Sequence, residues 1–168
     1  LHELYYTAEL PLCRVLAEME LAGVRVDAKA LAAFGTAMDA ELKGLERAIY
    51  EAAGGSFNIN SPKQLGEVLF DRLGLPHGRK TKTGWSTNAD VLEKLREHRI
   101  VADVLQYRQY AKLKSTYCDG LLKVIGPDGR VRTSFQMTVT ATGRLSSTEP
   151  NLQNIPTRTP LGSELRRM

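Results

Sequence analysis

The chain has 168 residues, of which 42% are hydrophobic, 25% charged and 7% aromatic, and this composition predicts a globular domain with a hydrophobic core. It excludes a disordered polar chain and a disulfide-stapled miniprotein, and because its two cysteines, Cys13 and Cys118, match no C-x-x-C pattern, neither a zinc cage nor a redox dithiol is indicated. The net charge of +4 is uneven, since residues 1–60 carry 5 Lys or Arg against 9 Asp or Glu and residues 61–168 carry 18 against 10.

The first two predicted elements are helices. The first has an apolar stripe at helical spacing and ends at Gly23, its stripe being Leu12, Val15, Leu16 and Met19. Asp27 is expected to cap the second, a long helix of about 25 residues that ends at Gly54 and Gly55. Its apolar positions recur at steps of three and four residues: Leu31, Phe34, Met38, Leu42, Leu45 and Ile49.

Two short helices are predicted next, with a loop between them. Ser61 and Gln64 form the pattern of a capping box at the start of the first short helix. Thr87 and Asp90 give a similar signal for the second. Residues 77–86 are therefore expected to form an exposed basic loop that presents Trp85 at its tip.

A second long helix is predicted to run toward Tyr117, with a core stripe of Ile100, Val104, Tyr107 and Ala111. On a neighbouring face the helical spacing brings together Arg108, Lys112 and Ser115. From residue 131 to residue 139 apolar and polar side chains alternate, which predicts a half-buried strand. The chain is polar and irregular from Thr140 onward.

Several enzyme classes lack their sequence signatures. The segment 78–86 has five residues between its first two glycines and continues with Trp85, so it is not a Walker A loop. Neither His-rich metal motifs nor serine-hydrolase or dinucleotide motifs occur, and neighbouring carboxylates such as Glu18 and Glu20 are interpreted as solvated helix faces. We expect a cytoplasmic protein without a membrane span or signal peptide, and the missing initiator Met indicates a piece of a longer chain.

Basic residues concentrate in three stretches that contain no acid, residues 73–89, 104–118 and 129–148. These stretches also carry hydroxyl, amide and tyrosine side chains that suit phosphate and sugar contacts. A nucleic-acid footprint is therefore the leading hypothesis, and a plain basic surface is the alternative.

Four motifs carry a family resemblance. They read FNINSP from residue 57, LQYRQYAKLKSTY from residue 105, TVTATGRLSS from residue 138 and EPNLQNIP from residue 149. In identity, order and spacing they resemble the family A DNA polymerases, and the resemblance covers essentially the whole chain. It implies a mainly helical α+β fold: a palm-side helix at residues 1–26, a helical thumb with two long helices at 27–122, and a partial palm with an antiparallel strand at 123–168.

The resemblance also implies DNA-binding residues. In the thumb, phosphate contacts are expected from basic, hydroxyl and amide side chains, namely Asn58, Asn60, Ser61, Lys80, Lys82, Ser86, Thr87, Arg108, Lys112, Lys114, Ser115 and Thr116. In the palm segment, contacts near the primer terminus are expected from Arg144, Ser146, Asn151, Gln153 and Asn154. Arg144 is expected to reach the minor-groove acceptors shared by all base pairs. The alternatives are a salt bridge from Arg144 to Glu149 and hydrogen bonding of the amides within their own loop.

The expected partner is duplex primer-template DNA, gripped by a monomer together with the remaining palm and fingers of the parent chain. The family's catalytic aspartates, which hold Mg²⁺ for nucleotide transfer in replication and repair, belong to motifs expected after Met168. The parent is thus expected to be a Mg²⁺-dependent DNA-directed DNA polymerase, and this fragment to be inactive, without a cofactor or catalytic residue. The alternatives are a stand-alone, non-enzymatic nucleic-acid-binding module and a poorly folded fragment that binds polyanions without specificity.

Overall fold

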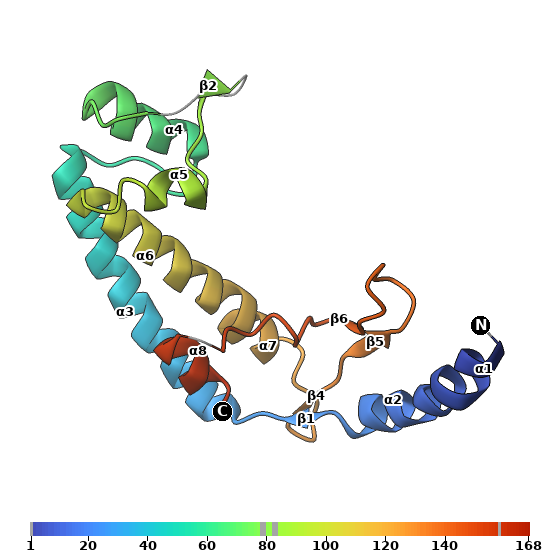
Figure 1. Cartoon of the computed structure of the whole chain (residues 1–168). Coiled ribbons are helices and arrows are strands. Elements are labelled where there is room, and N and C mark those ends of the chain that lie inside the picture. The colour runs from blue at the N-terminus through green and yellow to red at the C-terminus, as the bar shows by residue number, and fades with distance from the viewer. Residues whose placement is uncertain (1, 78–79, 82–83, 158) are drawn as a thin grey trace. The chain divides into compact units, whose positions relative to one another are not determined.

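A computed structural model describes residues 2–77, 80–81, 84–157 and 159–168 (Figure 1). Most of these residues are helical, and short strands pair in antiparallel two-stranded sheets, which confirms the predicted mainly helical α+β class. The contacts divide the chain into two compact units: unit 1 comprises Leu1–Gly35 and Ser115–Met168, and unit 2 comprises Thr36–Lys114. In the part of the chain that is described, no helix is both long enough and apolar enough to cross a membrane.

Unit 2 is a helical unit, to which α3 (Ala28–Ala53) contributes the part that follows Gly35. Along the chain come α4 (Pro62–Gly66), the π-helical η2 (Glu67–Arg72), β2 (Lys80–Thr81), β3 (Gly84–Trp85), α5 (Ala89–Glu93) and α6 (Arg99–Leu113). In unit 2, α6 lies along α3 (Figure 1). The core between its helices consists mainly of aliphatic side chains, among them Ile49, Leu65, Leu69, Leu92, Val101 and Val104.

The N-terminal ends of three helices allow the predicted capping residues to be compared with the structure. Asp27 caps α3 as predicted, because its Oδ1 accepts hydrogen bonds from the backbone N–H of Lys29 and Ala30, both at 3.0 Å. Ser61 is the predicted cap of α4. The prediction for α5 was wrong by one residue, because Asn88 rather than Thr87 caps it, with Asn88 Oδ1 3.0 Å from the N–H of Val91.

The prediction of an exposed loop at residues 77–86 was also wrong. This segment contains the antiparallel pair β2–β3, in which Lys80 lies opposite Trp85. Trp85 is half-buried instead of being exposed at a tip: its ring lies 4.1 Å from that of His77, and its Nε1–H donates to Asp71 at 2.9 Å. An indole that finds both ring neighbours and an acceptor is held against η2.

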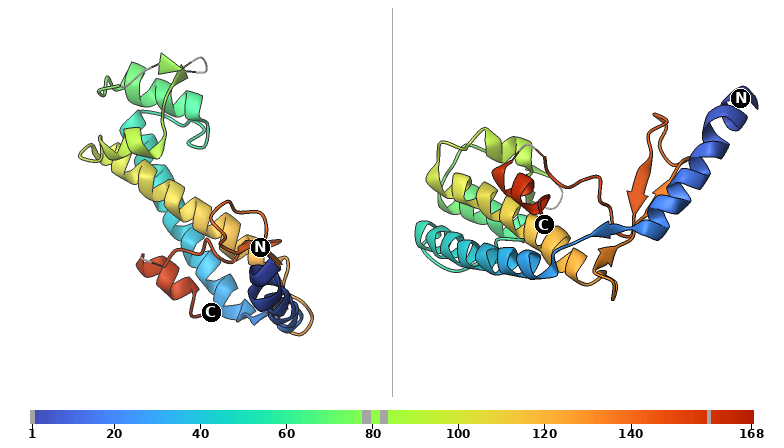
Figure 2. Two further views of the ribbon diagram at one scale, coloured as in Figure 1. Left: turned by 45° about the vertical axis from the view of Figure 1, so that its right-hand side comes forward. Right: turned by 90° about the horizontal axis from the view of Figure 1, so that it is seen from below.

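Unit 1 consists of the two ends of the chain. Its first part contains α1 (His2–Leu4), the π-helical η1 (Tyr5–Glu9), α2 (Leu10–Ala22), β1 (Val24–Arg25) and the start of α3. Its second part contains most of η3 (Lys114–Asp119), then α7 (Gly120–Leu122), β4 (Arg130–Val131), β5 (Ser134–Gln136), β6 (Ser146–Thr148) and α8 (Pro160–Leu165). Figure 2 shows β5 and β6 beside one another, joined by a long connection.

The prediction of a single strand at residues 131–139 was wrong. This segment contains β4, which pairs with β1 through Val131 and Val24, and β5, which pairs with β6 through Phe135 and Ser147. The break falls at Arg132 and Thr133, whose side chains bond elsewhere in unit 1. Burial alternates from Val131 to Ser134 but not within β5, where Phe135 and Gln136 are both half-buried.

The predicted apolar stripe of α2 is only partly buried. The helix forms where its spacing predicts, but among the stripe residues Leu16 is buried while Val15 and Met19 are each 50% exposed. On the neighbouring face Glu20 Oε1 accepts the backbone N–H of Phe135 at 2.6 Å, so Glu20 joins α2 to β5 and is not a purely solvated carboxylate.

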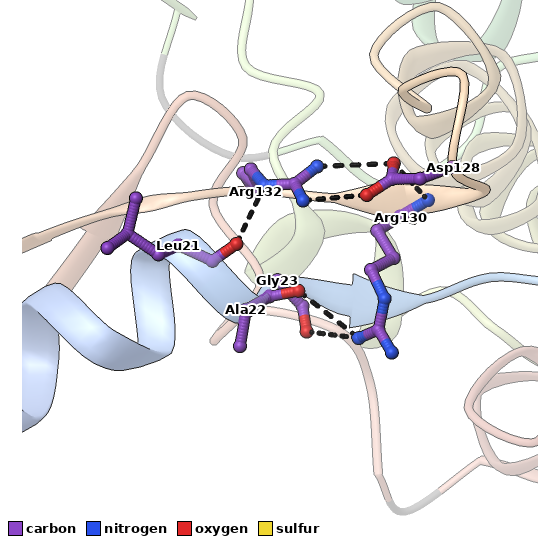
Figure 3. A network of polar contacts seen from close by, with 6 residues as sticks. All are labelled: Leu21, Ala22, Gly23, Asp128, Arg130 and Arg132. Carbon is purple, nitrogen blue, oxygen red and sulfur yellow. Dashed lines mark hydrogen bonds and ion pairs between the residues drawn. The ribbon is translucent and has the colours of Figure 1, made fainter.

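Two arginines of the third basic stretch have structural partners, as Figure 3 shows. Arg130 Nη1 donates to the carbonyl oxygens of Ala22 and Gly23, at 3.2 and 3.1 Å. Arg132 Nε donates to Leu21 O at 3.0 Å, and its Nη1 and Nη2 donate to Oδ1 and Oδ2 of Asp128 at 3.2 and 2.7 Å. These bonds satisfy carbonyl groups at the C-terminus of α2, which have no partner within the helix.

Candidate nucleic-acid interface

In unit 2 the turn before α4 brings together three of the predicted side chains. Asn58 Oδ1 accepts the N–H of Asn60 at 3.0 Å, and Ser61 Oγ accepts the N–H of Gln64 at 3.4 Å. Gln64 Oε1 accepts the N–H of Asn58 at 2.8 Å instead of completing the predicted capping box with Ser61. The two asparagines are exposed, so the turn presents their amide NH₂ groups to solvent.

A second set joins α6 to the segment before α5. Arg108 donates through Nη1 to the carbonyl oxygen of Thr87 and through Nη2 to Thr87 Oγ1, the latter at 3.2 Å. Thr87 is buried, Ser86 and Arg108 are half-buried, and burial lowers the pKa of Arg108 below its ordinary value. The predicted helix face that carries Arg108 thus contacts the predicted capping segment at Thr87, which helical spacing alone did not indicate.

The lysines of unit 2 have varied surroundings. Lys112 is exposed one helical turn after Arg108, whereas Lys114 Nζ lies 3.4 Å from Asp39 Oδ1. Lys80 Nζ lies 4.8 Å from the centre of the Trp85 ring, within cation–π range. Lys82, also predicted to bind DNA, lies outside the described residues.

In unit 1, η3 presents Ser115 and Thr116 at the surface and buries Tyr117. The hydroxyl of Tyr117 donates to the carbonyl oxygen of Asn154, and burial raises the pKa of this phenol. The π-helical turn therefore contacts the EPNLQNIP motif through a partly buried hydrogen bond. The sequence pattern placed Tyr117 only at the end of a helix.

The segment from Arg144 to Asn154 holds the remaining predicted residues. Arg144 is exposed, and Ser146 lies half-buried in β6. Asn151 Oδ1 accepts the N–H of Gln153 at 3.0 Å and of Asn154 at 3.2 Å. The alternative of hydrogen bonding within the loop thus holds for the carbonyl oxygen of Asn151, and its NH₂ is the group that can serve as a donor to a ligand.

Two further contacts define the chemistry of this segment. Gln153 Nε2 donates to Leu145 O at 3.0 Å, which closes the loop across its base. Within the described residues no ion pair joins Arg144 to Glu149, so the salt-bridge alternative for Arg144 is not what the structure has. Arg144 thus presents an exposed guanidinium and Asn151 an amide NH₂, which are donors that suit phosphate oxygens and minor-groove base edges.

The described residues do not group His, Cys, Asp and Glu in threes that could hold a metal ion. Two of the carboxylates are in ion pairs: Asp39 pairs with Lys114, and Asp128 with Arg132. The residues that the structure describes therefore do not form the carboxylate cluster that a Mg²⁺ site needs.

The comparisons with known proteins agree with the motifs. Residues 28–168 match the model of the family described as DNA polymerase family A. Over 160 residues the chain is 58% identical to a DNA polymerase I of Geobacillus stearothermophilus, and over 168 residues it is 55% identical to a thermostable DNA polymerase I of Thermus thermophilus. These matches cover 94% and 98% of the chain but 18% and 20% of the relatives, so the chain spans about a fifth of their length.

A solved structure is similar over nearly the same range. It is described as the POL domain of Pol1 from M. smegmatis in complex with DNA primer-template and dNTP. The match has a TM-score of 0.87 and 47% sequence identity, and it covers 94% of this chain and 28% of that one.

Proposed function

The chain belongs to DNA polymerase family A, and on that premise we propose that it is a DNA-gripping segment that binds the duplex of a primer-template. The observation that carries this proposal is the likeness, at a TM-score of 0.87, to a polymerase domain described in complex with primer-template DNA. The match to the family model spans residues 28–168, the range in which the candidate residues lie.

Unit 2 supplies the thumb part of this proposed grip. Arg108 and Lys112 lie one turn apart on α6, and the exposed amides of Asn58 and Asn60 precede α4. Such donors bind phosphate oxygens without reading the base sequence, and release of counterions from several phosphates gives the affinity. The proposed thumb, residues 27–122, is longer than unit 2 because it also includes the start of α3, most of η3, and α7.

The segment around Arg144 supplies the proposed palm part. Arg144 is exposed, and the NH₂ group of Asn151 remains a donor while its carbonyl oxygen holds the turn. In a minor groove these donors meet purine N3 and pyrimidine O2, which occur at similar positions in every base pair. We propose that Arg144 senses the geometry of the terminal pair in this way.

We assign nucleotide transfer to the longer polymerase and not to this segment. The chain spans about a fifth of the length of its curated relatives, and the family's Mg²⁺ chemistry is proposed for residues outside it. Primer extension by the isolated chain with Mg²⁺ and nucleotides is therefore expected to give no product. Template-directed synthesis by this chain would overturn that assignment.

The DNA grip is tested by fluorescence anisotropy of a labelled primer-template, titrated with the chain over a series of salt concentrations. We expect binding with little sequence preference and a steep salt dependence, with a slope of about −0.9 per phosphate contact. Arg108→Ala and Lys112→Ala are each expected to reduce the slope by about one contact. The matched control is Arg96→Ala, because the side chain of Arg96 is 69% exposed and pairs with Glu93. No binding at low salt, or equal slopes for all three variants, would contradict the proposal.

A further inference from the structure

Two hydroxyl groups form a buried polar cluster behind the segment that carries Arg144. Thr133 lies between β4 and β5 and is 7% exposed, and Ser147 lies in the middle of β6 and is 0% exposed. Thr133 Oγ1 and Ser147 Oγ are 2.7 Å apart. We call these two side chains the hydroxyl pair.

The hydroxyl pair binds the backbone on both sides of Glu149. Thr133 Oγ1 lies 2.9 Å from Thr148 O and 2.7 Å from Pro150 O, and Ser147 Oγ lies 3.2 Å from Pro150 O. The N–H of Leu152 donates to Ser147 Oγ at 3.1 Å. Residues 147–152 are therefore fixed to one buried point.

A count of hydrogens shows that each hydroxyl depends on the other. The pair has two O–H hydrogens, and their possible acceptors are two carbonyl oxygens and the opposite hydroxyl. Removal of either hydroxyl leaves a buried polar group without its partner, which costs more than the loss of a solvent-exposed bond. An apolar pair of similar size would fill the space, but it would not hold these carbonyl groups.

The candidate DNA-binding residues Ser146 and Asn151 are chain neighbours of residues that the hydroxyl pair holds in place. Ser146 and Leu145 precede Ser147 directly, and Leu145 O accepts Gln153 Nε2 at 3.0 Å. Asn151 lies between Pro150 and Leu152, whose backbone groups both bond to the pair. The direction of the Asn151 side chain and the path of the chain toward Arg144 thus follow from the buried bonds.

We propose that Thr133 and Ser147 are positioning residues that orient Arg144 and Asn151 toward DNA without touching DNA themselves. The inference rests on the proposed function, since it assigns a support to the same interface. It explains why a hydroxyl side chain is buried at Thr133, between the exposed Arg132 and Ser134, and at Ser147, next to the exposed Thr148.

The test combines variants of Thr133 with an exchange measurement. Thr133→Val keeps the shape and removes the hydroxyl, Thr133→Ser keeps the hydroxyl, and Thr138→Val is the matched control at an exposed threonine of the same segment. Anisotropy with primer-template DNA is expected to show about tenfold weaker binding for Thr133→Val, the equivalent of one lost buried hydrogen bond. Thr133→Ser and Thr138→Val are expected to bind within about twofold of the original chain.

A double-mutant cycle separates positioning from general weakening of the fold. If Thr133 acts through Arg144 and Asn151, Thr133→Val is expected to cost little further affinity once both residues are replaced by Ala. Additive losses in the cycle would overturn the positioning role while leaving the DNA grip intact. If Arg144→Ala and Asn151→Ala both bind as the original chain does, this segment does not contact DNA, and both proposals for it fail.

Hydrogen exchange in the unaltered, DNA-free chain tests the cluster even if Thr133→Val does not fold. The N–H of Leu152 is expected to exchange slowly, because it donates to a fully buried oxygen. Exchange of this amide at the rate of an unstructured peptide would overturn the positioning inference alone, since it would show that the cluster does not hold residue 152.

Discussion

Arg108 donates hydrogen bonds to both the carbonyl oxygen and the hydroxyl group of Thr87, and this relationship joins α6 to the segment before α5. A guanidinium has five N–H donors in a planar fork, so two can bind Thr87 while others remain for a phosphate. Burial lowers the pKa of Arg108, but an arginine starting from 12.5 keeps its charge at neutral pH. The same side chain can therefore stabilise unit 2 and still present N–H donors to a phosphate.

Arg108→Ala is expected to lower both stability and DNA affinity. The free energy of unfolding should fall by about 1–3 kcal/mol, because the buried hydroxyl and carbonyl of Thr87 lose their donor. Arg108→Lys should keep a positive charge but lose the two-pronged bond, so it should bind DNA better than Arg108→Ala. Urea unfolding and anisotropy measure the two effects. Unfolding unchanged by Arg108→Ala would show that the bond to Thr87 contributes nothing to stability.

Stability at alkaline pH should depend on Tyr117. Its pKa is raised above the ordinary 10.0 by burial, so the folded state retains the phenol proton more firmly than the unfolded state. The stabilisation is fully present below about pH 10 and is lost as pH rises through the raised folded pKa. Tyr117→Phe should therefore reduce the loss of stability above about pH 10, without abolishing the part that comes from Tyr50, whose pKa is also raised.

Near neutral pH the same substitution should have the opposite effect. Tyr117→Phe removes the donor to Asn154 O, and about 1 kcal/mol of stability should be lost. Chemical denaturation at pH 7 and at several points above pH 10 gives both values. If the original chain and the Phe variant lose stability in parallel at high pH, the phenol of Tyr117 is not protected by the fold.

The residues that the sequence predicted well are those whose environment is local. The cap at Asp27 and the stripe from Leu31 to Ile49 depend on neighbours within one helix, and the structure confirms the cap and buries much of the stripe. The start of α5 was misplaced by one residue because Thr87 and Asn88 are both good caps. In the structure Asn88 caps the helix, and the Thr87 hydroxyl accepts a hydrogen bond from Arg108, 21 positions away.

Long-range polar contacts could not be predicted from spacing. Thr133 resembles any inward residue of an alternating strand, yet its hydroxyl bonds across 15 and 17 residues to Thr148 and Pro150. Arg130 belongs to a basic stretch, yet it bonds to the carbonyl oxygen of Ala22 more than a hundred positions earlier. Such pairs form only after the chain has folded, so periodicity and composition carry no signal for them.

Gly23 should tolerate no side chain, because it stands at the end of α2 with φ +63°. A Cβ there would lie 2.9 Å from Val131 O and 2.9 Å from Arg132 Cγ, and the backbone oxygen cannot move without disturbing β4. Gly23→Ala should lower the free energy of unfolding by more than about 1 kcal/mol. Gly54→Ala is the matched control, since it has a similar φ of +71° but open space around the new Cβ. Equal thermal destabilisation by the two variants would assign the effect to backbone strain alone.

Asn151→Asp distinguishes the role of the amide oxygen of Asn151 in the turn from the role of its NH₂ group as a donor to DNA. The carboxylate can still accept the N–H groups of Gln153 and Asn154, so the turn and the free energy of unfolding should be preserved. It lacks the NH₂ donor and adds a negative charge, which repels phosphate, so DNA should bind more weakly than to Asn151→Ala. Asn151→Ala should instead lose about 1 kcal/mol of stability, because both N–H groups lose their acceptor. Melting curves and salt-dependent anisotropy of the two variants measure both effects. If Asn151→Asp binds DNA as well as the original chain does, the side chain of Asn151 serves the turn and does not donate to DNA.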